Sequence, residues 1–184
     1  MAGSYNNLGI ACSDKGDYDQ AIEYYQKDLT ISLKSLRPDH PDVGASYNNL
    51  GLAYSDKGDY GRAVEYYQKA LAIWLKSLGP DHPHVATSYG NLGVAYSDKG
   101  DYDRASEYYR KALAISLKTL GPDHPDVAGA YNNLGVAYFY KGEYDRAGEY
   151  YQKALAIRLK TLGPDHPHTK SVRESIKLLK SEAH

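Results

Sequence analysis

The sequence predicts an all-α array of four helix-turn-helix repeats followed by a C-terminal capping helix. The first observation that predicts this fold is a 42-residue period in the sequence. The second and third copies of the repeat agree at 33 of 42 positions, so neighbouring copies must share one fold. The second observation is the position of proline, because all 8 prolines fall in four short linkers, where paired prolines stop a helix. We therefore expect a single array over residues 1–184. Its repeats are residues 3–44, 45–86, 87–128 and 129–170.

Each repeat is expected to hold a shorter helix A and a longer helix B. Apolar residues at helical spacing form a stripe on helix A of the second repeat, made by Tyr47, Leu50, Gly51 and Tyr54. A Lys-Gly-Asp-Tyr turn follows at residues 57–60, where the glycine suits a left-handed helix end and the acid suits the next N-cap. The same reading of every copy predicts helices near residues 4–14, 18–36, 41–56, 60–78, 83–98, 102–120, 125–141 and 144–162.

The last helix is expected at residues 167–182 and differs from an ordinary helix A. Val172, Ile176 and Leu179 keep the apolar spacing, but Lys177 occupies the position of the packing glycine. A lysine there would keep a further helix B from packing closely. We therefore expect this helix to cap the array, as terminal repeats do in such proteins.

Composition and charge exclude several classes of function. The chain has 22 Lys+Arg against 23 Asp+Glu and no basic run, so nucleic acid is not an expected partner. No apolar stretch is long enough to span a membrane. The single cysteine, Cys12, cannot form an internal disulfide, which favours a reducing, cytoplasmic setting. No convergent set of catalytic residues is evident, so we expect neither an enzyme nor a cofactor.

The recurring residues resemble a known family. The order Tyr47, Leu50-Gly51, Tyr54, Gly58, Tyr60, Ala63, Tyr67, Ala70 resembles the tetratricopeptide repeat signature, and it recurs across residues 3–170. The longer period, together with the linker Leu78-Gly79-Pro80-Asp81-His82-Pro83, is similar to the repeats of kinesin light chain. This resemblance implies a right-handed α-solenoid whose A helices line a concave groove. It also implies an adaptor that binds peptide segments of partner proteins in that groove.

Helical-wheel arithmetic places four rows of side chains opposite the apolar stripe of helix A. They are the first amide row (Asn6, Asn48, Gly90, Asn132), the second amide row (Asn7, Asn49, Asn91, Asn133), the apolar row (Ile10, Leu52, Val94, Val136) and the edge row (Asp14, Asp56, Asp98, Tyr140).

These rows suggest a binding surface, because asparagine is a poor helix former and its repeated use needs a reason. A primary amide can hydrogen-bond the backbone of an extended peptide while the apolar row contacts its side chains. The alternative is that the amides bridge adjacent A helices and only order the stack. Kinesin light chain meets acidic peptides with basic groove residues, whereas this groove ends in Asp56 and Asp98. We therefore expect a neutral, apolar or basic partner segment.

Three further features of the sequence bear on function. The Asp-His-Pro-His linkers place two imidazoles beside a carboxylate, but helix capping explains them better than a metal site, so we expect no metal. Trp74 aligns with Ser32, Ser116 and Arg158 and is expected to be exposed on the outer face. The abrupt start at residues 1–4 suggests an uncapped array, so the alternative function is a structural or self-associating array that stacks end to end.

Overall fold

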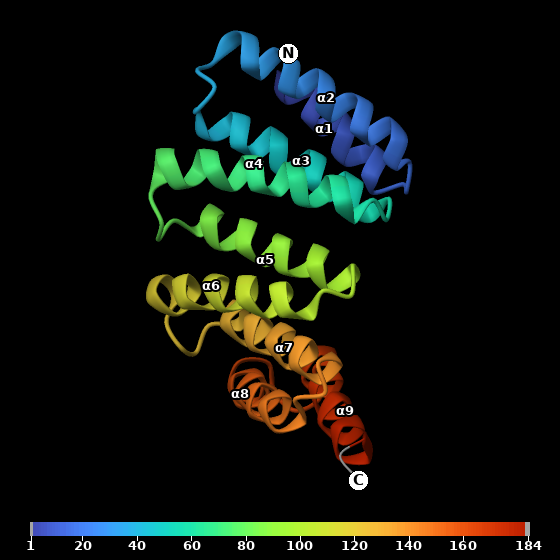
Figure 1. Ribbon diagram of the computed structural model, residues 1–184, viewed down its shortest axis with the longest axis vertical. Coiled ribbons are helices and arrows are strands. Elements are labelled where there is room, and N and C mark those ends of the chain that lie inside the picture. The colour runs from blue at the N-terminus through green and yellow to red at the C-terminus, as the bar shows by residue number, and fades with distance from the viewer. Residues whose placement is uncertain (1, 183–184) are drawn as a thin grey trace. The chain divides into compact units, whose positions relative to one another are not determined.

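The computed structural model describes residues 2–182, and all the regular structure in that range is helical (Figure 1). Nine helices are present in these residues, and their bounds lie within two residues of the sequence prediction at every end. They are α1 (Ala2–Ser13), α2 (Tyr18–Ser35), α3 (Pro41–Asp56), α4 (Tyr60–Leu78), α5 (Pro83–Asp98), α6 (Tyr102–Leu120), α7 (Pro125–Tyr140), α8 (Tyr144–Leu162) and α9 (Pro167–Glu182).

The helices fall into two compact units, which divide between Lys99 and Gly100, inside the third repeat. The first unit holds α1 to α5 and the second holds α6 to α9. Within each unit, every helix packs against the next helix along the chain. Such consecutive packing is the arrangement of a repeat array, in which each helix pair is stabilised by its neighbours. One continuous array over residues 1–184 remains a prediction.

The helix ends follow from the turn and linker residues. Gly58 adopts a φ of 84°, which favours glycine, and the Asp59 carboxylate accepts a hydrogen bond from the Arg62 backbone N–H at 3.1 Å. In the linker, His82 is the N-cap of α5, and its Nδ1 accepts from the His84 backbone N–H at 3.1 Å. Pro83 then occupies the first turn, where a missing N–H costs nothing. The linker histidines therefore cap helices, as the sequence predicted.

Close packing within a helix pair depends on the glycine of helix A. A Cβ atom at Gly51 would lie 2.6 Å from the ring of Tyr67 on α4, and Gly135 stands in the same relation to Tyr151 at 2.5 Å. Because the glycine has no side chain, the aromatic ring lies directly on the backbone of helix A. Tyr67 and Leu50 are consequently fully buried. These contacts confirm the buried stripe and the close approach of helices A and B.

The prediction for Trp74 is wrong. Its side chain is only 3% exposed, and its Nε1 donates a hydrogen bond to the Pro41 carbonyl at 3.0 Å. The indole also stacks on the His84 ring, with 4.8 Å between ring centres, and it covers Gly44. Trp74 therefore fills the space between α3 and α5 beside the start of each helix. Polar residues at the aligned positions suggested a surface site, but this side of helix B is covered by the next helix A.

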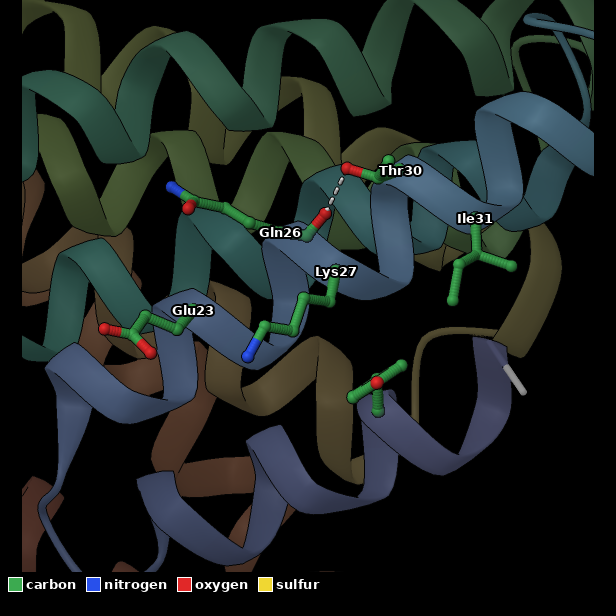
Figure 2. A pocket seen from close by; sticks show the side chains of 6 residues that line it. Glu23, Gln26, Lys27, Thr30 and Ile31 are labelled. Atoms are coloured by element: carbon green, nitrogen blue, oxygen red, sulfur yellow. Dashed lines mark hydrogen bonds between the residues drawn. The ribbon is translucent and has the colours of Figure 1, made fainter.

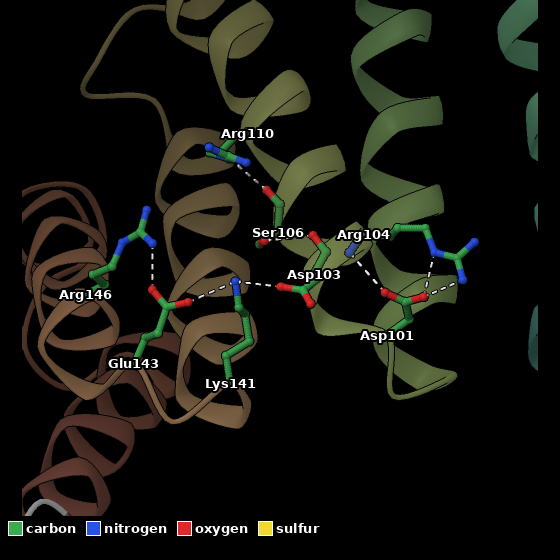
Figure 3. Close-up of polar contacts among 8 residues, drawn as sticks. All are labelled: Asp101, Asp103, Arg104, Ser106, Arg110, Lys141, Glu143 and Arg146. Atoms are coloured by element: carbon green, nitrogen blue, oxygen red, sulfur yellow. Dashed lines mark hydrogen bonds and ion pairs between the residues drawn. The ribbon is translucent and has the colours of Figure 1, made fainter.

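Charged side chains join the turn after α7 to α6 in the second unit (Figure 3). The Lys141 ammonium lies 2.8 Å from the Asp103 carboxylate and 2.9 Å from that of Glu143. Hydrogen bonds to both acids raise the pKa of Lys141, and the bonds that Glu143 accepts from Lys141 and Arg146 lower the pKa of Glu143. Lys57 pairs with Asp19 at the equivalent place in the first unit. These partly exposed pairs help fix successive repeats, and each contributes little stability by itself.

Two aligned serines differ in their partners, which gives a matched test of buried polar groups. The Ser46 hydroxyl donates to the Asp28 carboxyl at 2.6 Å, whereas the buried Ser88 hydroxyl has no hydrogen-bond partner among the described residues. We expect Ser46→Ala to lower the free energy of unfolding by about 1–3 kcal/mol, because it leaves the carboxyl of Asp28 unsatisfied. Ser88→Ala should be neutral or stabilising by up to about 1 kcal/mol. Urea denaturation followed by circular dichroism measures both, and equal losses would contradict this account.

Candidate functional site

The apolar row remains exposed on successive A helices of the first unit. Ile10 on α1, Leu52 on α3 and Val94 on α5 are 43%, 41% and 40% exposed. Each of these residues has the same position in its repeat, so the row presents one apolar side chain per helix A at a regular spacing. In the second unit, Val136 on α7 is half-buried. Large apolar side chains repeated along one face are typical of a surface that contacts another molecule.

The two amide rows form hydrogen bonds between neighbouring A helices in the first unit. Asn49 Nδ2 donates to Asn6 Oδ1 at 2.7 Å, and Asn91 Nδ2 donates to Asn48 Oδ1 at 3.0 Å. Asn48 is only 9% exposed. These bonds are the contacts that the structural alternative expects. Each uses one donor of one amide and one acceptor position of the other, so the amides retain further hydrogen-bonding capacity.

The remaining predicted amides differ in exposure. Asn7 is exposed on α1, while Asn132 and Asn133 are half-buried on α7 in the second unit. Tyr140, at the end of α7, is 60% exposed and stacks on Tyr102, with 5.0 Å between ring centres. Tyr140 thus offers an aromatic surface that is already held in place from one side.

The acidic edge of the first unit lies beside buried tyrosine hydroxyls. Asp56 and Asp98 are exposed at the ends of α3 and α5, yet nearby protein atoms displace part of their water, which raises the pKa of both carboxyl groups. Burial raises the pKa of Tyr67. A hydrogen bond with Ser55 acts in the opposite direction but has the smaller effect. A cation brought to this edge would favour the ionised form of both acids.

A surface hollow of about 570 Å³ lies between α1 and α2 (Figure 2). It is lined by Tyr5, Glu23, Gln26, Lys27, Thr30 and Ile31, and by none of the predicted site residues. The Lys27 ammonium lies 5.2 Å from the centre of the Tyr24 ring, and the Thr30 hydroxyl donates to the Gln26 carbonyl at 2.8 Å.

A group of buried polar residues around the first repeat was not predicted from the sequence. Asp28 and Ser32 are each 5% exposed and Ser46 is 4% exposed. A signal was present in the sequence, because Asp28 aligns with alanine in the other three repeats, at Ala70, Ala112 and Ala154.

Neither a metal centre nor a membrane span appears in the described part of the chain. Within residues 2–182, no three His, Cys, Asp or Glu side chains lie together in a way that would hold a metal ion. None of the helices in this range combines the length and the apolar character needed to cross a bilayer.

Comparisons with solved structures find the same architecture in other proteins. A Podosopora anserina protein described as a kinesin light chain with nearly identical TPR-like repeats is 29% identical, with a TM-score of 0.85, over 98% of this chain and 85% of that one. BtubC (BKLC) from P. vanneervenii is also 29% identical, with a TM-score of 0.86, over 96% of this chain and 70% of that one. The apo form of RapI, at 17% identity and a TM-score of 0.86, covers 99% of this chain and 64% of its own length, and shares the fold.

Sequence comparison gives the family. A search of curated proteins finds no match. The tetratricopeptide repeat model, by contrast, matches in four overlapping segments, at residues 1–74, 56–118, 99–160 and 126–183. These matches cover nearly the whole sequence, and the chain therefore belongs to the tetratricopeptide repeat family, whose helical arrays are scaffolds for protein–protein interaction.

Proposed function

We propose that this protein is an adaptor that binds an extended segment of a partner protein along its A helices. The observation that carries the proposal is the apolar row of the first unit, where Ile10, Leu52 and Val94 stay about two-fifths exposed on three consecutive A helices. Apolar side chains repeated along one face are typical of a contact surface, and on the A helices they lie beside amides that can hydrogen-bond a peptide backbone. The single cysteine, Cys12, is free, which suits a reducing compartment such as the cytoplasm.

The chemistry of the bound segment follows from the groups beside the apolar row. Amides of both rows can hydrogen-bond a peptide backbone with the donors and acceptors that their mutual bonds leave unused. Asp56 and Asp98 place negative charge at one end of the face. We therefore propose a segment with apolar side chains and neutral or basic character. Asn132, Asn133, Val136 and Tyr140 would contribute the corresponding contacts in the second unit.

The test uses a peptide selected on the immobilised protein from a displayed random library. In the double variant Leu52→Asp, Val94→Asp, affinity should fall at least about ten-fold, because apolar contacts are lost and charges are introduced. The matched control is Leu33→Asp, Leu75→Asp, which changes two leucines of similar exposure (41% and 37%) on B helices. Fluorescence anisotropy gives both affinities. If the control weakens binding as much as the A-helix variant, this proposal fails.

A second candidate, a purely structural or self-associating array, is favoured by the amide bonds between A helices. The variant Asn49→Ala, Asn91→Ala separates the two roles. Alanine is the better helix former, which offsets much of the stability lost with two interhelical bonds. If the amides also hold a peptide, affinity should fall about five- to hundred-fold with little change in melting temperature. Lower stability with unchanged affinity would assign the amides to the stack alone, and sedimentation velocity of the free protein would then report any self-association.

A further inference from the structure

A cavity of about 270 Å³ with several polar side chains in its lining lies between α1, α2 and α3. Its polar lining comes from Asn6, Asp28, Ser32, Asp42, Ser46 and Asn49, and no Lys, Arg or His among the described residues lines it. Asn6 and Asn49 are also the first hydrogen-bonded pair of the amide rows. The cavity therefore lies directly beside the proposed peptide-binding face.

The cavity contains a buried carboxyl group without a cationic partner. Asp28 is 5% exposed and accepts one hydrogen bond, from Ser46. No lysine, arginine or histidine within residues 2–182 forms an ion pair with it. A carboxylate can accept about four hydrogen bonds, and burying one without a counter-charge is unfavourable. Asp28 is thus an acceptor with unused capacity, next to a space that a ligand can enter.

The second repeat shows what the cavity lacks. There the equivalent cleft, between α3, α4 and α5, is filled by the indole of Trp74, and Ala70 replaces the aspartate. In the first repeat the residue aligned with Trp74 is Ser32, which is too small to fill the same space. Two departures from the second repeat, Ser32 and Asp28, therefore open the cavity and place a carboxyl in it.

The fourth repeat shows that a guanidinium suits this position. Arg158 aligns with Trp74 and Ser32, and its Nη1 donates to the carbonyl of His168, at the start of α9, at 2.8 Å. The side chain is half-buried, and burial lowers the pKa of Arg158. In that repeat the chain itself supplies the guanidinium. In the first repeat the corresponding space, beside Ser32, is open. The Asp28 carboxyl next to it has the charge opposite to that of a guanidinium.

We propose that the cavity between α1, α2 and α3 binds the guanidinium group of an arginine in the partner segment, with Asp28 as its counter-ion. The proposal rests on the proposed adaptor function and specifies one side chain of the bound segment. Ser32 and the Asn6–Asn49 pair surround the planar group, and its several N–H donors match the oxygen acceptors of the lining. Lysine, with a compact ammonium, would use fewer of these acceptors and is expected to bind more weakly.

The test uses N-acetyl-arginine amide as the probe and ¹H–¹⁵N correlation spectra of the whole chain. Saturable shifts are expected at the backbone amides of Ser46 and Asn49, with a dissociation constant in the millimolar range. The citrulline analogue has the same shape without the charge and should bind at least about ten-fold more weakly, since it forms no ion pair with Asp28. Equal binding of the two probes, tighter binding of the lysine analogue, or the absence of saturable shifts would overturn the proposal.

Two variants that copy the second repeat provide the controls. Asp28→Ala removes the counter-ion and Ser32→Trp fills the cavity, so each should weaken arginine-amide binding at least about ten-fold. Asp28→Asn keeps the shape of the side chain and should weaken arginine-amide binding to the same extent. It replaces the other two variants if circular dichroism shows that either of them disturbs the fold. Binding that survives loss of the charge contradicts the proposal.

The outcome is independent of the test of the adaptor function. The two tests use different probes and different residues: the arginine amide reports on Asp28 and Ser32, whereas the selected peptide reports on Leu52 and Val94, neither of which lines the cavity. If the arginine amide does not bind in the cavity, the peptide-affinity test of the apolar row is unaffected. If the apolar-row variant binds the selected peptide normally, the arginine-amide test is unaffected.

Discussion

Replacing Trp74 with alanine is expected to lower the free energy of unfolding by about 3–5 kcal/mol. The change empties the space between α3 and α5, removes the hydrogen bond to the Pro41 carbonyl and ends the stacking on His84. The cost follows from a large cavity that the surrounding helices fill only in part. Urea denaturation followed by far-ultraviolet circular dichroism measures the loss without depending on tryptophan fluorescence.

The control for this prediction is the neighbouring residue on the same helix. Leu75 is 37% exposed, so Leu75→Ala should cost no more than about 0.5 kcal/mol. If both variants unfold at the same urea concentration as the wild type, Trp74 is not the buried link between repeats that the structure describes.

Leu50→Ala is expected to cost about 2–5 kcal/mol, because Leu50 is fully buried at the centre of α3. Leu52 lies on the same helix, two residues further on, and is 41% exposed. Leu52→Ala should therefore change stability by no more than about 0.5 kcal/mol. Thermal unfolding of the two variants under the same conditions gives the comparison. Similar losses at both positions would show that the faces of helix A are assigned wrongly.

The helix bounds could be predicted from sequence because their signals are local. Proline and glycine fix the linkers, and a glycine with positive φ, such as Gly58, ends helix A whatever the surrounding helices do. Repetition strengthened each assignment, since a pattern seen in one copy had to hold in the next. The buried stripe of helix A was predictable for the same reason, because its spacing depends on one helix alone.

Contacts between helices could not be predicted in the same way. Helix B is covered on one side by helix A of its own repeat and on another side by helix A of the next repeat. The spacing of apolar residues along helix B indicates chiefly the contact within its own repeat. Trp74 lies on the second side, where Ser32 and Arg158 at aligned positions suggested solvent. The pairing of Asn49 with Asn6 depends on the offset between two A helices, which a helical wheel of one helix does not contain.

The proposed binding surface for the partner segment is the A-helix face of the first unit. Its most direct test places a photo-reactive benzoylphenylalanine at Val94 on α5 or, as the matched control, at Leu75 on α4, and irradiates each variant with the library-selected peptide. We expect mass spectrometry to find a covalent peptide adduct from position 94 and none from position 75. An adduct from position 75 alone would contradict the proposed surface, because the peptide would then lie on a B helix.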